Sequence, residues 1–357
     1  MKRFANALVY GKFYPPHAGH VALVQHAVSL ADRVTIACFG TSSDRMTPLR
    51  RATALANDAG IRAGRRQHRV ISGIDEAPFD LDSDTVWEAH VAVLNAHLGA
   101  DERPDVLVTS EAYGPELARR LGIAHEFFDI DRSAHPISGT RVRADPIGHW
   151  NHLGPAAQRL LTTRVVVVGA ESTGTSTIAQ ALAERLRRRG GAWERTLVVE
   201  EYGRELTQRK QREAANGGPL PVSVEWTRED FVEVVREQRN REHEAAARSG
   251  PVLVCDTDAL ATMVWEQRYT GQSTITSSSY NGDIYLLTDH AGVPFVQDGV
   301  RDGEHLRAEM TEQFAQRLIW AEVPWVMLTG SLAERINLAE RMADQACEAK
   351  LAFTTPF

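Results

Sequence analysis

Ten residues near the N-terminus combine a lysine, two histidines and glycines in a spacing that suits a polyphosphate. The stretch runs Gly11-Lys12-Phe13-Tyr14-Pro15-Pro16-His17-Ala18-Gly19-His20. The His-x-x-His spacing lets both imidazoles lie on one side of a helix, and a helix N-terminus adds unpaired N–H groups and a partial positive charge. A lone histidine is usually an ordinary surface residue, but this pair beside Gly19, with Lys12 nearby, favours phosphate binding.

A strand and a helix must position these groups. Residues 7–10 form a short apolar run and residues 21–28 have helical spacing, so the stretch lies on a strand-to-helix turn. Open α/β sheets bind their ligands at such turns. Apolar strands and helical patterns continue to alternate through the first half, which predicts βαβ crossovers and a mostly parallel sheet.

A second turn of similar chemistry appears near residue 138. It reads Ile137-Ser138-Gly139-Thr140-Arg141-Val142-Arg143. The Ser138 hydroxyl and the backbone can donate hydrogen bonds to phosphate oxygens, and Arg143 adds a planar, permanently charged fork. Taken alone, the segment is more typical of a capped surface helix.

Composition narrows the class of protein. A chain of 357 residues exceeds the roughly 100 to 200 residues of one domain, so two domains are expected. A net charge of −7 argues against nucleic-acid or membrane partners, which usually require a basic face. We find no apolar run of spanning length and no signal-peptide pattern, so a cytoplasmic location is expected. Cys38, Cys255 and Cys347 are scattered, which excludes a disulfide framework and a structural zinc site.

Proline and glycine interrupt both periodicities in residues 145–155. We therefore predict a first domain at residues 1–150, a linker at 151–163 that contains a short helix, and a second domain at 164–357. The helical pattern over residues 332–352 covers the second core or serves an interface, and the sequence leaves the oligomeric state open, a homo-oligomer included.

The second domain opens with a phosphate-binding pattern. An apolar strand at residues 164–168 runs into Gly169-Ala170-Glu171-Ser172-Thr173-Gly174-Thr175-Ser176-Thr177 and then a helix. This is the order of a P-loop, whose N–H groups cradle phosphates and whose Ser176 would hold magnesium. The motif requires lysine where this chain has Thr175, so a cation is missing. A glycine turn that binds no nucleotide is the alternative.

Later segments add acidic and cationic candidates. Asp256 follows a buried strand at residues 251–255, a position suited to the magnesium shell beside a P-loop. Glu201 follows another strand in the same way. The glycine-containing loop at residues 296–307 is typical of loops that close over phosphates, so Arg301 and Arg307 are the first candidates to replace the lysine charge.

The two turns of the first half together resemble the paired signature of the nucleotidyltransferase superfamily, especially of nicotinamide-nucleotide adenylyltransferases. The resemblance implies transfer of AMP from ATP to a phosphorylated acceptor by direct attack, with pyrophosphate leaving. It implies that His17 and His20 stabilise the transferring phosphate and that Lys12 and Arg143 stabilise pyrophosphate. It also makes Trp87 a candidate for stacking on nicotinamide, although a buried helix tryptophan is the commoner explanation.

The second half resembles the kinase half of the NadR-type proteins, in which such an adenylyltransferase is fused to a ribosylnicotinamide kinase. The residues that carry this are Gly169-x-Glu171-Ser172-x-Gly174, Asp256-Thr257-Asp258 and Gln297-Asp298-Gly299-x-Arg301-Asp302-Gly303. The resemblance implies phosphorylation of nicotinamide riboside by ATP and Mg²⁺, and then conversion of nicotinamide mononucleotide to NAD. Asp256 would be occupied by metal, which leaves Asp258 and Glu201 as contenders for the base.

The expected fold is thus α/β, with a Rossmann-like nucleotidyltransferase sheet followed by a P-loop kinase-like sheet. The main rival is an active adenylyltransferase whose second domain has lost catalysis and serves as a nucleotide sensor. Some family members carry a DNA-binding domain ahead of the first motif. Because the motif begins at Gly11, we expect none here, and a DNA-binding regulator is the weakest hypothesis. A preference for nicotinamide or nicotinate mononucleotide stays open.

Overall fold

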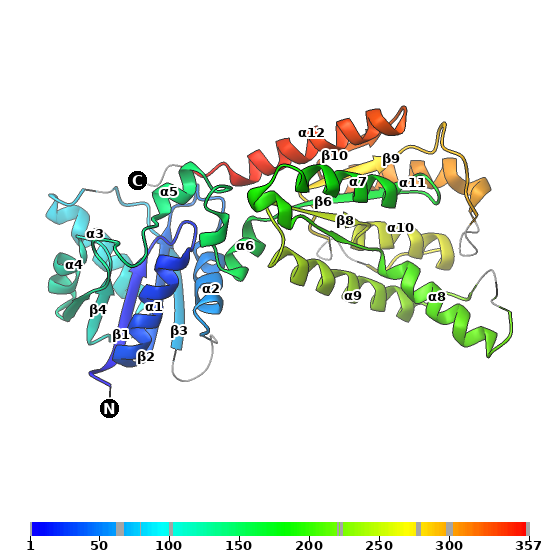
Figure 1. Cartoon of the computed structure of the whole chain (residues 1–357). Coiled ribbons are helices and arrows are strands. Elements are labelled where there is room, and N and C mark those ends of the chain that lie inside the picture. The colour runs from blue at the N-terminus through cyan, green and yellow to red at the C-terminus, as the bar shows by residue number, and fades with distance from the viewer. Residues whose placement is uncertain are drawn as a thin grey trace. The chain divides into compact units, whose positions relative to one another are not determined.

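The computed structural model divides the chain into two compact units. It describes residues 2–61, 68–78, 80–99, 103–219, 221, 224–275, 280–297 and 303–354. The first unit contains the described residues up to Leu160 together with Leu351–Thr354, and the second contains those from Leu161 to Lys350. Each unit is built on its own five-stranded sheet. Figure 1 shows the helices that flank each sheet.

The first unit alternates strands and helices in chain order. Its sheet has the order β3-β2-β1-β4-β5, and every pairing is parallel. Its elements are β1 (Phe4–Gly11), α1 (Ala18–Leu30), β2 (Ala31–Gly40), α2 (Pro48–Asp58), β3 (His68–Ile74), α3 (Asp84–His97), β4 (Val106–Thr109), α4 (Gly114–Leu121), β5 (Ala124–Phe127), α5 (Gly139–Ala144) and α6 (Pro155–Leu161).

Helices cover both faces of the first sheet. On one face, buried side chains of α1 and α2 pack against Val9 and Ile36. On the other face, α3 and α4 pack against Leu8 and Ala37. Because successive strand residues point to opposite faces, the continuous apolar run of β1 fits a strand buried on both sides. The crossovers reverse direction between β1 and β4, the kind of switch point at which ligands bind.

The second unit repeats this plan. Its sheet has the order β10-β9-β6-β8-β7, again with parallel pairings throughout. Its elements are β6 (Thr163–Gly169), α7 (Thr175–Arg187), β7 (Leu197–Val199), α8 (Tyr202–Ala215), α9 (Arg228–Ala246), β8 (Val252–Asp256), α10 (Ala259–Thr270), β9 (Ile284–Thr288), α11 (Arg307–Trp320), β10 (Trp325–Leu328) and α12 (Leu332–Leu351). On one face, α9, α10 and α11 enclose the core around Val166 and Leu253.

The predicted fold class is confirmed by these two parallel sheets. α4 ends where Gly122 adopts a left-handed conformation with φ 69°. α12 covers nearly the range of residues 332–352 that the helical pattern predicted. The boundary at Pro155 is likewise a helix start, since Asp58 of α2 accepts hydrogen bonds from Ala156 N (2.7 Å) and Ala157 N (3.0 Å).

The predicted division into 1–150, 151–163 and 164–357 differs from the observed units in two places. Residues 151–160 pack as part of the first unit, because Asp58 caps α6 and Gln158 donates to the carbonyls of Trp150 and Leu153. The chain end from Leu351 also belongs to the first unit. The expected linker is therefore largely part of the first unit.

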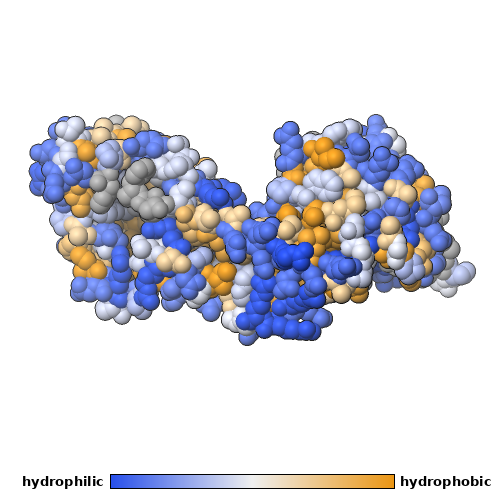
Figure 2. Space-filling model, turned by 90° about the horizontal axis from the view of Figure 1, so that it is seen from above, coloured by the Kyte–Doolittle hydropathy of each residue, from blue (hydrophilic) through white to orange (hydrophobic). Residues whose placement is uncertain are grey.

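The surface is mixed in polarity. On the face shown in Figure 2, hydrophilic side chains surround separate groups of apolar ones. Within the described parts of the chain, no helix combines the length and apolar character needed to cross a membrane.

The C-terminal segment contacts the first signature turn. The Phe353 ring meets the Tyr14 ring edge-on at 5.2 Å between centroids, and Thr354 Oγ1 lies 3.1 Å from the Tyr14 hydroxyl. The guanidinium of buried Arg51 covers the Tyr14 ring at 4.8 Å and pairs with Asp44 at 2.9 Å. Tyr14 is thus held by groups that lie far from it in the sequence.

Replacing Phe353 by alanine should loosen this turn. We expect Phe353→Ala to lower the protection of β1 amides against hydrogen exchange by about 1 kcal/mol, the size of an aromatic pair contribution. Leu332→Ala, at a position with 52% exposure, is the control and should change protection little. Equal protection in Phe353→Ala and the parent chain would contradict this contact.

Candidate functional site

A cleft of about 510 Å³ lies at the switch point of the first sheet. Residues from both signature turns line it, together with the ends of β1 and β4 and the start of α3. The predicted site residues that line it are Gly11, Lys12, Phe13, His20, Trp87, Ser138, Thr140 and Arg143. Two turns separated by more than a hundred residues therefore meet in one cleft.

The two histidines stack on each other at the start of α1. Their ring centroids are 3.6 Å apart and their planes differ by 25°. His17 is 3% exposed and lies behind His20, so only His20 lines the cleft. Gly19 leaves room for this stack, because a Cβ there would lie 3.2 Å from the His17 ring.

Burial keeps both imidazoles neutral in the absence of an anion. Burial, and then the charges of Arg132, His152 and Arg143, lower the pKa of His17 to about 3. Burial, and then His17, Arg132 and Arg143, lower the pKa of His20 well below its usual value. Both ring nitrogens of His17 and Nδ1 of His20 have no hydrogen-bond partner among the described residues. Unpartnered buried groups in a cationic setting suit an anionic ligand.

Arg143 joins the two turns. Its Nη1 donates to the carbonyl of Tyr14 at 2.6 Å, and its Nη2 donates to Thr140 Oγ1 at 3.1 Å. Ser138 caps α5 by accepting the Arg141 N–H at 3.2 Å, so its hydroxyl proton is left to donate. The pKa of Lys12 is lowered overall, because burial, which lowers it, is the largest effect, although the nearby Asp44 and Asp75 carboxylates raise it.

Trp87 forms part of the cleft wall. It is 6% exposed, and its indole N–H donates to the carbonyl of Leu81 at 3.0 Å. Nearby, His90 Nδ1 lies 2.6 Å from an Asp75 oxygen and its Nε2 lies 3.1 Å from the Pro78 carbonyl. His90 and Asp75 both line the cleft but were not among the predicted site residues.

Arg132 is a cation of this cleft that the motifs did not include. It lines the cleft and pairs with Glu111 at 2.9 Å. The loop that presents it is organised by Asp129, whose carboxylate accepts the N–H groups of Ala134 and His135. The sequence signal that could have indicated this cation is Asp131-Arg132-Ser133, which lies shortly before the second turn.

A second cleft, of about 170 Å³, lies over the P-loop of the second unit. Strand β6 is buried along its whole length and the loop turns through Ser172 (φ 59°) and Gly174 (φ 90°) into α7. The predicted residues that line the cleft are Gly169, Glu171, Ser172, Gly174, Thr175, Ser176, Thr177, Glu201 and Asp256. Thr173 does not line it. The Thr173 hydroxyl donates to the Ala170 carbonyl at 2.7 Å, a hydrogen bond within the loop that stabilises its conformation.

Asp256 faces the start of α7. The hydroxyls of Ser176 and Thr175 donate to its carboxylate, and burial raises its pKa although these hydrogen bonds and the charge of Arg204 lower it. A hydroxyl and a carboxylate beside a phosphate-binding loop fit Mg²⁺, which takes few protein oxygens and completes its shell with water and phosphate. No cluster of three or more His, Cys, Asp or Glu side chains suited to a metal occurs in the described residues.

The loop after β9 is tied to the P-loop. Glu171 accepts the Gly303 N–H at 2.7 Å and pairs with Arg268 at 3.3 Å. Arg307 Nη2 donates to the Ser172 carbonyl at 3.1 Å. Arg307 thus contacts the P-loop backbone but does not line the cleft, and Arg301 lies outside the described residues.

Asp258 is a structural residue rather than a contender for the base. It is 1% exposed, and its Oδ1 caps α10 by accepting the N–H groups of Leu260 (2.8 Å) and Ala261 (3.2 Å). Its Oδ2 accepts the Tyr285 hydroxyl at 2.5 Å. Thr257, with φ 77°, turns the backbone between Asp256 and Asp258, so only Asp256 reaches the cleft.

Aromatic and polar residues of the second cleft escaped sequence reasoning. The rings of Trp226, Phe231 and Tyr269 stack, with centroids 4.9 Å apart for Trp226 and Phe231 and 5.9 Å apart for Trp226 and Tyr269. Arg204, in the first turn of α8, also lines the cleft. Nothing in the local sequence places Trp226, Phe231 and Tyr269 beside the P-loop, whereas Arg204 closely follows Glu201, which the strand pattern had placed at this edge of the sheet.

The buried pair of Asp258 and Glu242 predicts a pH dependence of stability. Burial and the mutual repulsion of the carboxylates raise the pKa of Glu242 above its value in the unfolded chain. The folded state therefore keeps this proton to higher pH, and stability falls as pH rises above the unfolded value of roughly 4.3. We expect Glu242→Gln to flatten this decline in the melting temperature of the second unit.

The control for this experiment is Glu244→Gln, an exposed position two residues away. It should keep the parent slope of melting temperature against pH. The same slope in Glu242→Gln and the parent chain would show that Glu242 does not bind the extra proton.

Comparisons with known proteins show what this chain resembles. A family model described as an AAA domain matches residues 164–335. The trifunctional NAD biosynthesis/regulator protein NadR of Escherichia coli is 26% identical over 317 residues, which cover 82% of this chain and 71% of that protein. NadR of Salmonella typhimurium is 25% identical over 318 residues, with the same coverage.

Solved structures show the same fold. A NadR protein in complex with NR matches 99% of this chain and 98% of its own with a TM-score of 0.63 and 20% identity. A NadR protein in complex with NAD and AMP-PNP matches 100% of this chain and 99% of its own, again with a TM-score of 0.63 and 20% identity. These matches show that the chain is homologous to NadR proteins over 82% of its length and shares the fold of the solved NadR structures.

Proposed function

We propose that the chain is a bifunctional enzyme of NAD salvage. Its first unit transfers the adenylyl group of ATP to nicotinamide mononucleotide and releases pyrophosphate. Its second unit phosphorylates nicotinamide riboside with ATP and supplies that mononucleotide. The observation that carries the proposal is the meeting of Lys12, His20, Arg143 and Trp87 in one cleft at the switch point of the first sheet.

In the first cleft the acceptor phosphate oxygen attacks the α-phosphorus of ATP, and the bond from that phosphorus to the bridging oxygen of pyrophosphate breaks. His20, backed by His17, donates a hydrogen bond to the α-phosphate. Lys12 and Arg143 neutralise the leaving pyrophosphate. The geometry favours this assignment because Arg143 is fixed by Tyr14 and Thr140 before substrate arrives.

Trp87 gives the acceptor a wall on which nicotinamide can stack. Asp75 and Asp80 line the same cleft, and their negative charges favour a cationic pyridinium ring. A nicotinate carboxylate would be repelled by them. We therefore propose that nicotinamide mononucleotide is the preferred acceptor.

In the second cleft the 5′-hydroxyl of nicotinamide riboside attacks the γ-phosphorus of ATP, and ADP leaves. Glu201 lines the cleft and takes the hydroxyl proton, because Asp258 is buried as a helix cap. Ser176 and Asp256 would hold Mg²⁺, which neutralises phosphate charge when bound. Trp226, Phe231 and Tyr269 line this cleft and give the riboside an aromatic wall.

A nucleotide sensor is the second candidate for the second unit. Thr175 favours it, because its hydroxyl donates to Asp256 where a P-loop lysine would reach phosphate. Incubation with nicotinamide riboside and Mg-ATP separates the two candidates. ADP and mononucleotide should form, whereas ATP binding without ADP formation would favour the sensor.

His20→Ala should abolish most adenylyl transfer. Loss of a positioned donor to the transferring phosphate typically costs on the order of 100-fold in rate. We expect this loss in NAD formation from the mononucleotide and ATP, with phosphorylation of nicotinamide riboside by ATP, measured as ADP, unchanged. His26→Ala, on the same helix but away from the cleft, is the control. Full NAD formation by His20→Ala would refute the role of this histidine.

Trp226→Ala should weaken riboside binding. An aromatic face is worth about 1 to 2 kcal/mol to a desolvated cation, so the KM for nicotinamide riboside should rise about tenfold while the KM for ATP changes little. Trp320→Ala, at a position with 71% exposure, is the control. An unchanged KM for the riboside in Trp226→Ala would exclude this ring from the binding site.

A further inference from the structure

The P-loop of the second unit carries no charge of its own at the lysine position. Thr175 occupies that position, and its hydroxyl donates to the Asp256 carboxylate. A bound ATP still brings several negative charges next to Asp256 and Glu171, both of which line the cleft. A cation from another element must therefore reach the phosphates if this cleft binds ATP, as the proposed kinase function requires.

Two described arginines contact the P-loop but do not line the cleft. Arg307 Nη2 donates to the carbonyl of Ser172 (3.1 Å), a residue of the cleft lining, and to that of His290 (3.3 Å), but Arg307 itself does not line the cleft. Arg268 pairs with Glu171 and covers the Tyr269 ring at 4.9 Å. Both arginines therefore contact residues of the P-loop from outside the cleft lining.

Arg204 occupies a different position. It is half-buried, lies in the first turn of α8 and lines the cleft with the P-loop. Among the described residues that line this cleft, it is the one with a cationic side chain. Its charge also favours the ionised form of Asp256, so the guanidinium lies within electrostatic reach of the end of α7 that receives phosphate.

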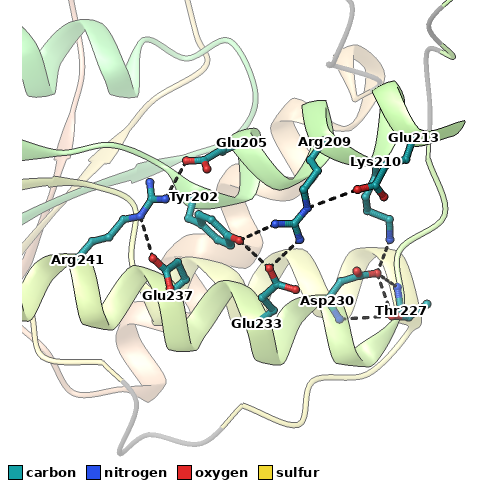
Figure 3. Close-up of polar contacts among 10 residues, drawn as sticks. All are labelled: Tyr202, Glu205, Arg209, Lys210, Glu213, Thr227, Asp230, Glu233, Glu237 and Arg241. Carbon is teal, nitrogen blue, oxygen red and sulfur yellow. Dashed lines mark hydrogen bonds and ion pairs between the residues drawn. The ribbon is translucent and has the colours of Figure 1, made fainter. Parts of the chain in front are cut away.

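A polar network holds α8 against α9 (Figure 3) and so fixes the backbone that carries Arg204. Glu233 of α9 accepts the Tyr202 hydroxyl at 2.6 Å and Arg209 Nη2 at 2.7 Å. Arg241 pairs with Glu205 at 2.9 Å. The residues immediately before and after the Gly203-Arg204 pair are thus both anchored to α9.

We propose that Arg204 is the phosphate-binding cation of the second cleft and takes the place of the missing P-loop lysine. A guanidinium stays charged at any relevant pH and can bind two phosphate oxygens through parallel N–H groups. Because α8 supplies it from outside the loop, Thr175 is free to bind Asp256. The loss of the lysine therefore does not leave the γ-phosphate without a positive partner.

The test measures binding of Mg·AMP-PNP and Mg·ADP to the full chain by calorimetry. Arg204→Gln should weaken AMP-PNP binding at least tenfold and ADP binding less, because the missing contact is to the terminal phosphates. Arg212→Gln, an exposed position on the same helix, is the matched control and should bind both nucleotides as the parent chain does. Parent-like AMP-PNP affinity in Arg204→Gln would overturn the proposal.

A second variant separates charge from folding. Adding Thr175→Lys to Arg204→Gln restores a cation from within the loop, so AMP-PNP affinity should return to within about threefold of the parent. If it does not return, the first variant acted through the structure of α8, and the assignment of Arg204 to phosphate fails.

Parallel assays of nicotinamide riboside phosphorylation keep this proposal apart from the kinase function. AMP-PNP binding that depends on Arg204, without any ADP formation from ATP and riboside, supports the phosphate site and refutes the kinase. Riboside phosphorylation that is unchanged in Arg204→Gln overturns the role of Arg204 and leaves the kinase intact.

Discussion

Both units place N–H-rich turns and cationic side chains at the carboxyl edge of a parallel sheet, the arrangement that the negative charge of a polyphosphate requires. A strand-to-helix turn provides unpaired N–H groups there, but several phosphate charges also need cationic side chains. In the first unit, Lys12, Arg132 and Arg143 line the cleft with His20, and burial lowers the pKa of both His17 and His20 so that their imidazoles are neutral. Burial and the nearby cations thus act in the same direction, since both lower the pKa of these histidines.

In both clefts, residues far from the glycine-containing turn in the sequence help to set the charge of the site. In the first, Arg143 reaches back to the carbonyl of Tyr14, and the chain end braces the other side of Tyr14 through Phe353. In the second, the loop itself lacks a cation, and α8 brings Arg204 to the cleft. Long-range packing therefore decides the charge of each site as much as the local motif does.

Sequence reasoning predicted what local patterns encode. The turn around Gly11 and the P-loop around Gly174 were placed correctly at the ends of buried strands, because periodicity and glycine punctuation are local signals. Asp258 was predicted as a contender for the base, but a turn at Thr257 directs it into a helix cap. Trp226 and Arg204 were missed because only the packing of α8 and α9 brings them to the cleft.

Incubation of the purified full chain with nicotinamide riboside and Mg-ATP, with all nucleotide products quantified over time, tests the central claim most directly. If both proposed reactions occur, the amount of ADP should equal the summed amounts of nicotinamide mononucleotide and NAD at every time point. The amount of pyrophosphate should equal the amount of NAD. Formation of neither mononucleotide nor NAD would contradict this claim.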